Sequence, residues 1–448
     1  MRLIANCNIM PKLSDVLKQL SGHSGFRRYF SNMSWLFAEN TLRLVAGLLV
    51  GVYVARYLGP SQFGGLSYAI SFAGLFGAIS DLGLEGIVVR NLVAFPEKRD
   101  LYLGTAFWLK LTGSFIMLGV IAIAIQFTSN DHATNLYIFI IASGLIFQSF
   151  QVVDFYFQSK VLSKYVSICK MSQLLLSSIV KLFLVFLNAT LIWFVLVMLV
   201  DCVLLSVSLF VAYRSQRFGL FFAHFDLKTA KEMLADSWPL VFSGLTVMVY
   251  LRIDQIMIKE MLGASELGLY SAAVKLSEIW YFLPGIITTS LFPAIINAKK
   301  SSSDLYARRL QRLYSLMVWL ALFIALPVSL ASEWVIKSLY GIAFVQAAGV
   351  LKIYIWGGVF VFLSAAFGKY LIAENLTRKN LYRVAFGAII SVPLNYVLIR
   401  AYGIRGAAIA SLISLFGANY AYDLFDRELW GQLKLKTFAF VNPISLKL

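Results

Sequence analysis

Cysteine, histidine and charged residues are all scarce in this chain. Its 448 residues include only three cysteines and three histidines, and charged residues make up 14% of the total. No two cysteines form a CxxC pair, and no group of Cys and His has the spacing of a zinc site. The sequence therefore predicts neither a disulfide framework nor a metal centre nor redox chemistry.

The N-terminal region also lacks a feature. Residues 1–33 contain no continuous apolar run of the kind found in a cleavable signal peptide. Residues 14–30 could form a short basic amphipathic helix on the membrane surface, or a disordered tail. We expect residues 1–33 to be a cytoplasmic segment.

Apolar residues, in contrast, dominate the chain. Hydrophobic residues make up 60% of it, and the mean hydropathy is +0.78. These values are far from those of a soluble domain and indicate a multi-pass membrane protein. The net charge of +17 could suggest nucleic acid as a partner. Its distribution along the chain fits membrane topology better, and we expect no nucleic-acid partner.

Twelve apolar segments are each long enough to cross about 30 Å of hydrocarbon at about 1.5 Å per residue. They are 34–57, 63–90, 101–127, 134–157, 166–187, 190–213, 238–262, 267–293, 311–331, 345–373, 380–400 and 404–424. We therefore predict an all-α integral membrane fold with twelve transmembrane helices.

The basic residues alternate between the segments that connect these spans. One side carries 27 of the 39 basic residues, including Arg383 and Lys436. The other side carries only Arg56, Lys259, Lys337, Arg400 and Arg405. By the positive-inside rule, the first side is cytoplasmic and both termini lie there.

A polar connector, 214–237, divides the spans into two sets of six. The predicted organisation is an N-terminal segment 1–33, a first six-helix bundle 34–213, a cytoplasmic linker 214–237, a second six-helix bundle 238–425 and a cytoplasmic tail 426–448. Because each set holds an even number of spans, the second enters the membrane from the same face as the first. This arrangement is typical of transporters whose parallel repeats enclose a substrate site.

A short pattern recurs near the start of each half, which supports duplication. Leu58, Gly59, Ser61, Gly64, Ser67 and Ala69 have identical counterparts 204 residues later in Leu262, Gly263, Ser265, Gly268, Ser271 and Ala273. Small residues at such spacing let membrane helices approach each other closely. We expect both copies to form an outer turn between the first two spans of a half.

Fourteen charged residues fall inside the predicted spans. The basic ones are Arg43, Lys110, Lys181, Arg252, Lys275, Lys352 and Lys369. The acidic ones are Glu39, Asp81, Glu85, Asp154, Asp201, Asp254 and Glu278. Because such side chains almost always face a bundle interior or a water-filled cavity, the two halves should enclose a wet passage and not meet in an apolar seam.

Two interpretations of these charges stay open. They could be structural salt bridges, or the cations could attract an anionic head group while a carboxylate titrates or binds a coupling cation. The candidate substrate-binding cations are Arg43, Lys110, Arg252 and Lys275. The candidate coupling or pairing carboxylates are Glu39, Asp81, Glu85, Asp254 and Glu278. Lys181, Lys352 and Lys369 lie close enough to span ends to snorkel.

Depth along the spans suggests where these charges gather. Arg43, Asp81 and Lys110 all lie about 13 Å from the cytoplasmic ends of their spans. In the second half, Asp254 and Lys275 lie about eight residues from the outer surface, or about 12 Å. We expect one charge layer in the cytoplasmic half of the first bundle and another in the outer half of the second.

Several motifs together resemble bacterial polysaccharide flippases of the Wzx type, in the superfamily that also contains multidrug exporters and the peptidoglycan lipid flippase. They are LGPSQFGGLSYAISFAGL from residue 58, DLGLEGIVVR from 81, RIDQIMIKEMLG from 252, ELGLYSAAVKLSE from 266, LFPAI from 291 and YGIRGAAIASL from 402. The resemblance covers nearly the whole chain.

This resemblance implies two six-helix bundles that form a V around a central cavity in the bacterial inner membrane. It implies transport of undecaprenyl-pyrophosphate-linked oligosaccharides, such as O-antigen units, by alternating access, with Arg43, Arg252 and Lys275 as candidates to hold the pyrophosphate. It implies no catalysis and no cofactor beyond coupling to Na⁺ or H⁺. A polysaccharide polymerase and chain-length machinery are the implied protein partners.

Two alternatives remain from the residues themselves. A cation-coupled exporter of small molecules or drugs would use one dominant carboxylate in a closed pocket. A membrane enzyme, such as a polymerase or glycosyltransferase, would normally carry a large loop or an acidic metal-binding motif. The chain has no DxD motif, which disfavours the enzyme.

Overall fold

The computed structural model describes residues 24–441, and this part of the chain contains α-helices and short 3-10 helices but no β-strand. The predicted all-α fold is therefore confirmed. The predictions for residues 1–23, which include the start of the possible surface helix 14–30, lie outside the described residues. The last part of the predicted tail, residues 442–448, lies outside them as well.

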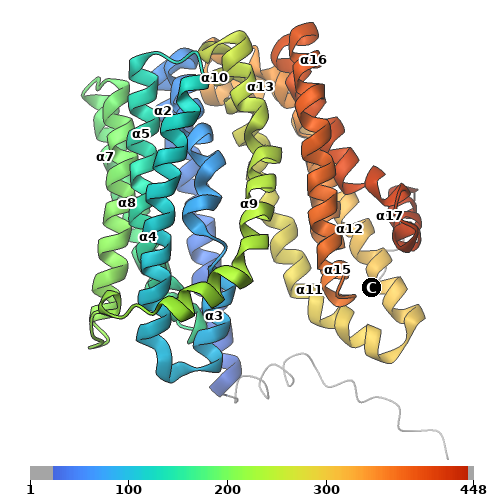
Figure 1. Cartoon of the computed structure of the whole chain (residues 1–448). Helices are drawn as coiled ribbons and strands as arrows, with labels where there is room; N and C mark the ends of the chain where they lie inside the picture. The colour runs from blue at the N-terminus through green and yellow to red at the C-terminus, as the bar shows by residue number, and fades with distance from the viewer. Residues whose placement is uncertain (1–23, 442–448) are drawn as a thin grey trace, which may run out of the picture.

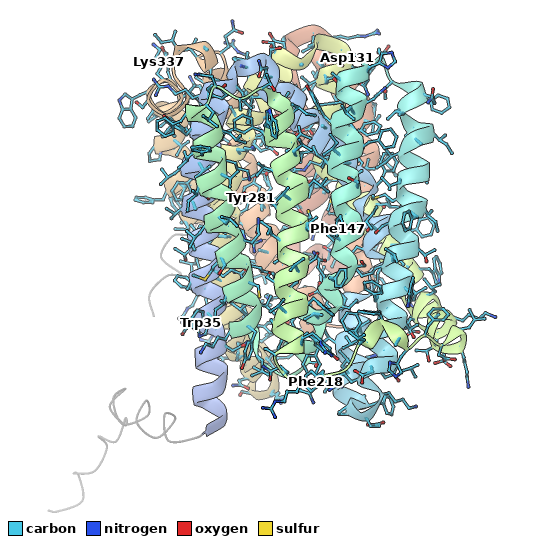
Figure 2. All side chains as sticks on the ribbon, turned by 90° about the vertical axis from the view of Figure 1, so that its left-hand side faces the viewer. Trp35, Asp131, Phe147, Phe218, Tyr281 and Lys337 are labelled. Carbon is cyan, nitrogen blue, oxygen red and sulfur yellow. The ribbon has the colours of Figure 1, made fainter. Side chains whose placement is uncertain are left out.

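The helices of the first half run antiparallel to one another between two ends of the molecule (Figure 1). Their bounds are α2 Ser24–Asp81, α3 Glu85–Ala94, η1 Pro96–Lys98, α4 Arg99–Ala124, η2 Ile125–Phe127, α5 His132–Phe147, η3 Gln148–Gln151, α6 Val152–Ser159, α7 Ser163–Phe186, α8 Leu191–Arg214 and η4 Phe221–Ala223. Figure 2 labels Asp131 at one end of this bundle and Phe218 at the other, and we name the two ends after them.

The second half lies beside the first, with α9 and α10 packed against it (Figure 1). Its elements are α9 Leu227–Leu262, α10 Ala264–Glu278, η5 Ile279–Tyr281, α11 Phe282–Ser301, α12 Ser303–Leu330, α13 Ser332–Tyr340, η6 Ile342–Phe344, α14 Ala347–Tyr354, α15 Gly357–Ala373, α16 Thr377–Asn419, η7 Ala421–Leu424, η8 Arg427–Leu429 and α17 Trp430–Val441.

Ten helical segments of the described chain are long and apolar enough to cross a membrane. Two of them contain a break where a glycine adopts a positive φ, at Gly59 (φ 68°) in α2 and at Gly403 (φ 61°) in α16. Only glycine adopts this conformation without a steric cost, so both turns depend on that residue. The segment that contains Gly59 is interrupted once more, at Leu82 and Gly83, where α2 ends and α3 begins inside the predicted span 63–90.

The predicted linker 214–237 is helical in its second part, because α9 begins at Leu227. The Asp226 carboxylate caps this helix by accepting a hydrogen bond from the Thr229 backbone N–H at 2.7 Å. An ion pair of 2.6 Å between Arg90 and Asp236 binds the start of α9 to the first half. The linker therefore packs on the first bundle instead of forming a loop between the halves.

The predicted tail contains a packed helix, α17. The Tyr314 hydroxyl donates to Gln432 at 2.7 Å, which binds α17 to α12. Lys436 is completely buried and pairs with Asp423 at 2.5 Å, and Arg383 lies 3.5 Å from the same carboxylate. The sequence places Arg383 and Lys436 among the basic residues of connecting segments, whereas the structure buries both within helices, α16 and α17. A helix of twelve residues is too short to be recognised as a span, so hydropathy does not predict this burial.

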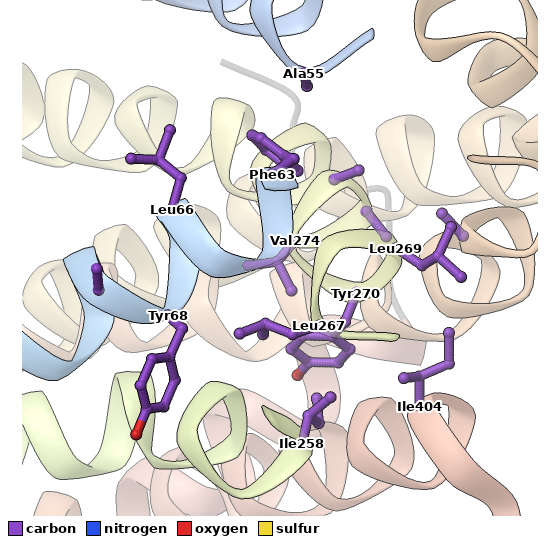
Figure 3. Close-up of a cluster of buried hydrophobic side chains, with 14 of the residues drawn as sticks. Ala55, Phe63, Leu66, Tyr68, Ile258, Leu267, Leu269, Tyr270, Val274 and Ile404 are labelled. Atoms are coloured by element: carbon purple, nitrogen blue, oxygen red, sulfur yellow. The ribbon is translucent and has the colours of Figure 1, made fainter. Parts of the chain in front are cut away.

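One apolar cluster joins the two halves near the Asp131 end (Figure 3). It combines Phe63 and Leu66 of α2 with Leu267 and Val274 of α10 and with Ile258 of α9. Of two further clusters, one combines residues of the first half with Met233 of α9, and the other lies within the second half. The expectation that the halves enclose a wet passage and do not meet in an apolar seam is therefore wrong at this end, where apolar side chains of both halves pack together.

The duplicated turn lies within this contact. A Cβ atom added at Gly64 would collide with the carbonyl oxygen of Ala264, and one added at Gly268 would collide with that of Pro60. Each copy of the turn therefore supplies the glycine against which the other copy packs. The close approach needs small residues, as in other contacts between membrane helices.

Candidate functional site

The predicted site residues of the first half form pairs within that half. Arg43 and Glu39 make an ion pair of 2.5 Å one turn apart on α2, and the Ser167 hydroxyl donates to the buried Glu39 at 2.9 Å. The Arg43 side chain remains 55% exposed. It occupies the same helix face as Gly47 and Val50, which line a cavity described below.

Lys110 and Asp81 form an ion pair, as their similar depth suggested. The Lys110 side chain is completely buried and lies 5.7 Å from the centre of the Phe155 ring. Glu85 accepts a hydrogen bond of 3.0 Å from Gln158. Because Lys110 has no exposed surface and holds a carboxylate, its position is that of a structural ion pair.

In the second half, the predicted site residues are paired less closely. Arg252 and Glu278 face each other at 3.9 Å, the outer limit of an ion pair. Asp254 is buried and has no ion-pair partner within the described chain; it accepts hydrogen bonds from Tyr270 at 2.5 Å and from Ser411 at 3.1 Å. Within residues 24–441, no three His, Cys, Asp or Glu side chains lie together as metal ligands. Any cation at Asp254 would therefore rely on this carboxylate and neighbouring hydroxyl oxygens.

Lys275 is an exposed cation with no ion pair in the described part of the chain. Its ammonium group lies 4.6 Å from the centre of the Phe63 ring, so this lysine of the second half reaches over a helix of the first. Arg252, Lys181 and Glu278 all lie within electrostatic reach of it. Three cations stand against two carboxylates, Glu278 and the Asp201 that pairs with Lys181, so the site keeps one net positive charge.

A cavity of about 210 Å³ contains the Lys275 side chain, and we call it the central cavity. Helices α2, α7 and α8 of the first half form its walls, and Lys275 of α10 is its single contribution from the second half. Lys181 and the Ser177 and Ser178 hydroxyl groups supply the other polar surface. The cavity therefore presents cations from both halves to one space.

Lys181 is the functional candidate that the sequence placed wrongly. Its position near the end of a span suggested a side chain that snorkels to the membrane surface. Instead, it lines the central cavity and pairs with Asp201 at 3.1 Å. Depth along a helix does not determine which way a side chain points, and only the partner Asp201 could have suggested an inward orientation.

Polar contacts between the halves accompany the apolar cluster at the Asp131 end. Glu260 of α9 accepts hydrogen bonds from the Tyr68 hydroxyl at 2.9 Å and the Ser129 hydroxyl at 2.8 Å. Deeper in the bundle, the Ser71 hydroxyl donates to Gln255 at 2.6 Å. These bonds connect the end of α9 to the first half and keep the Asp131 end closed.

A second and larger cavity, of about 650 Å³, lies inside the second half, and we call it the second-half cavity. Tyr250, Tyr281 and Tyr354 line it together with Asn380, Asn419 and apolar side chains, and no charged residue is among the residues that line it. The buried hydroxyl groups of Tyr250 and Tyr281 have no hydrogen-bond partner within the described chain.

Comparison with known proteins gives consistent results. The model of a family described as polysaccharide biosynthesis protein matches residues 30–299, more than half of the chain. The capsular polysaccharide biosynthesis protein CapF of Staphylococcus aureus is 22% identical over 411 residues, which cover 89% of this chain and 99% of CapF.

Solved structures resemble this one over most of its length. An inward-facing multidrug resistance transporter of the MATE family and the MOP superfamily superposes with a TM-score of 0.60 at 14% identity, covering 90% of this chain and 96% of the transporter. The lipid II flippase MurJ, in an inward closed conformation, gives a TM-score of 0.56 at 14% identity, with 92% and 91% covered. At this identity the likeness shows a shared fold, and it confirms the predicted MATE and flippase type of architecture for a multi-pass membrane protein.

Proposed function

The chain belongs to the polysaccharide biosynthesis protein family, as the motifs predict, and on that premise we propose that it is a flippase for undecaprenyl-pyrophosphate-linked oligosaccharides. The flippase carries repeat units of O-antigen or a related surface polysaccharide across the bacterial inner membrane by alternating access. It has no catalytic step, and a polymerase with its chain-length machinery uses its product.

The unpaired Lys275 in the central cavity is the observation that carries this proposal. Its ammonium group faces a space shared by the two halves, with Lys181 and Arg252 nearby. A pyrophosphate group carries several negative charges and binds where ammonium and guanidinium donors converge. Of the predicted cations, Lys275 and Arg252 are therefore the main head-group ligands, and Arg43 lies on the path towards them.

A polar path is needed because the saccharide cannot cross lipid unaided. Moving one unpaired hydroxyl group from water into hydrocarbon costs roughly 4 kcal/mol or more, so an oligosaccharide with about ten of them faces tens of kcal/mol. The central cavity supplies such a path for the head group, while the polyprenyl chain stays in the bilayer.

The proposed topology has twelve crossings, because the breaks at Gly59 and Gly403 each divide one apolar segment into two. The Phe218 end faces the cytoplasm, where the positive-inside rule places most of the basic residues. The Asp131 end faces outward and is closed. Export then requires the Tyr68–Glu260 and Ser71–Gln255 hydrogen bonds to break as the halves separate at that end.

Asp254 supports a second candidate function, a cation-coupled exporter of small molecules from the same superfamily. This buried carboxylate has two hydroxyl donors and no basic partner within the described residues, as a proton or Na⁺ site requires. Coupling to H⁺ or Na⁺ is compatible with both functions. The two differ in substrate, since a drug exporter needs no anion site at Lys275.

Deletion of the gene from its host tests the main proposal. We expect undecaprenyl-linked repeat units to accumulate on the cytoplasmic leaflet, and surface polysaccharide to fall to less than a tenth of its normal amount. The wild-type gene should restore both, and the Lys275→Gln variant should not. Normal surface polysaccharide together with increased drug sensitivity would instead establish the exporter.

A further inference from the structure

The first half contains another polar cavity next to the central cavity. It has a volume of about 260 Å³ and lies between η3, α7 and α8. Three glutamines line it: Gln148 and Gln151 from η3 and Gln173 from α7. We call it the glutamine cavity. All three residues fall inside apolar segments of the chain, about ten residues or more from the nearest segment end for Gln148 and Gln173.

The amide groups of these three glutamines do not stabilise the fold through hydrogen bonds within the described chain. None of the three side chains makes a hydrogen bond to any residue that the structure describes, although each amide offers two donors and an acceptor. An uncompensated amide at this depth costs roughly 2 kcal/mol or more, so three of them together need water or a ligand. The cavity therefore presents polar groups that are available for binding.

The charges in the cavity are balanced, which indicates the chemistry of the ligand. Asp201 accepts hydrogen bonds from Lys181 at 3.1 Å and from Ser177 at 2.7 Å, so the one carboxylate and the one ammonium group neutralise each other. A neutral site with many donors and acceptors suits a polyhydroxylated molecule better than an ion. The volume equals that of about nine water molecules, the scale of a single sugar residue.

The glutamine cavity adjoins the central cavity, and two side chains form the border between them. Lys181 and Met198 line both this cavity and the central cavity, and Lys181 lies within electrostatic reach of Lys275. A ligand with an anionic group beside Lys275 would pass Lys181 to reach the glutamines. In a lipid-linked saccharide, the group next to the pyrophosphate is the first sugar.

We propose that the glutamine cavity is the saccharide-recognition subsite, in which Gln148, Gln151, Gln173 and Asp201 hydrogen-bond to the hydroxyl groups of the sugar nearest the pyrophosphate. This inference rests on the proposed flippase function and adds residues that distinguish one saccharide from another. Lys181 connects the two subsites, because its ammonium group borders both the sugar and the phosphate.

Two ligands separate the subsites in a binding experiment on the full chain in lipid nanodiscs. Undecaprenyl pyrophosphate carries the head group alone, and the lipid-linked saccharide extracted from the host's deletion strain carries the sugar as well. Gln173→Met keeps the side-chain volume and removes the amide. We expect it to weaken saccharide binding threefold to tenfold, the value of one hydrogen bond, and to leave undecaprenyl pyrophosphate binding unchanged. The matched control is Gln126→Met at an exposed position outside the cavity.

Cys202 gives a second readout that does not depend on a glutamine variant, because it lines the same cavity. With Cys7 and Cys169 replaced by serine and alanine, a small methanethiosulfonate reagent should label Cys202. The lipid-linked saccharide should slow that labelling at least fivefold, and undecaprenyl pyrophosphate should not.

Each other result has a distinct meaning. If both ligands bind but Gln173→Met weakens neither or both equally, or if the saccharide leaves Cys202 labelling unchanged, the subsite is wrong and the flippase proposal stands. A Cys202 that the reagent cannot reach also contradicts the subsite. If neither ligand binds the wild-type protein, the proposed function itself fails, and the subsite fails with it.

Discussion

The two halves share a duplicated turn and an antiparallel helical design, but their cavities differ in chemistry. Cations, a carboxylate and unpartnered amides line the cavities of the first half, including Lys181, Asp201 and Gln173. The second-half cavity is the largest of the three described here, yet tyrosines, asparagines and apolar residues form its surface. One architecture therefore provides a polar compartment on one side and a mainly apolar one on the other.

This difference suggests that the two halves bind different parts of a substrate. Under the proposed flippase function, the charged and sugar-bearing part of the substrate would bind to the first half, and the second half would contribute Lys275 across the boundary. The cavity of the second half itself is lined by no charged residue, and pairs such as Arg252 with Glu278 and Asp423 with Lys436 lie outside it. The shared turn contact is the one feature to which both halves contribute in the same way.

That shared contact gives the largest expected effect. A methyl group at Gly64 would collide with the Ala264 carbonyl oxygen, a backbone atom that cannot move without displacing α10. We expect Gly64→Ala to reduce transport to below a tenth and to destabilise the protein by about 1–3 kcal/mol. Gly268→Ala should behave in the same way because its contact is reciprocal. Transport in proteoliposomes and the midpoint of thermal unfolding measure both effects.

The matched control is Gly74→Ala, on the same piece of α2. A methyl group there would meet no atom within 4 Å. Transport and unfolding should stay close to the wild-type values. If Gly64→Ala were as harmless as Gly74→Ala, the two copies of the turn would not hold the halves together.

Lys110 distinguishes the structural charges from the functional ones. Lys110→Met should destabilise the protein by about 2–3 kcal/mol, less than for a fully buried pair because nearly half of the Asp81 side chain is exposed. Adding Asp81→Asn should restore most of the loss, since no unpaired charge then remains. Thermal unfolding of the single and double variants checks this. Unchanged stability with loss of head-group binding would assign Lys110 to the substrate site instead.

In the second half, Lys436 should make the stability of the protein depend on pH, an effect smaller than that of Lys110→Met. Burial, aided by the nearby Arg383 charge, lowers the pKa of Lys436 from 10.5 to about 7. Between these pH values the unfolded chain binds a proton that the folded protein does not, so the stability due to this group rises with pH from about 7 towards 10. The unfolding midpoint of the wild type should show this rise, and Lys436→Met should lack it. An equal pH slope in both proteins would contradict the prediction.

Substitution of Tyr281, in the second-half cavity, should have the smallest effect on stability and on head-group binding. Its buried hydroxyl has no partner within the described chain, so Tyr281→Phe removes a polar group that makes no hydrogen bond. We expect stability to change by less than about 1 kcal/mol, and binding of undecaprenyl pyrophosphate by less than twofold. A tenfold loss of binding would place the head group in this cavity and reverse the comparison between the halves.

The sequence predicts the features that change local hydropathy or charge. Charges inside apolar runs stand out, which is why Lys110 and Asp81 were found, and the duplicated turn follows from identical small residues. The rotation of a helix does not follow from depth, so Lys181 was misplaced. Uncharged amides such as Gln173 barely change local hydropathy, and α17 is shorter than a span. The packing of the halves at the Asp131 end depends on contacts between distant segments, which no local pattern encodes.

The most direct test of the account is the affinity of the purified protein for undecaprenyl pyrophosphate, compared among the wild type, Lys275→Gln and Lys275→Arg. Lys275 has no ion pair in the described chain, so its replacement should leave the unfolding midpoint unchanged. We predict at least tenfold weaker binding for Lys275→Gln, about 1.4 kcal/mol or more, and binding within threefold of wild type for Lys275→Arg. Equal affinity in all three proteins would contradict the central claim that the central cavity, with Lys275, binds an anionic head group.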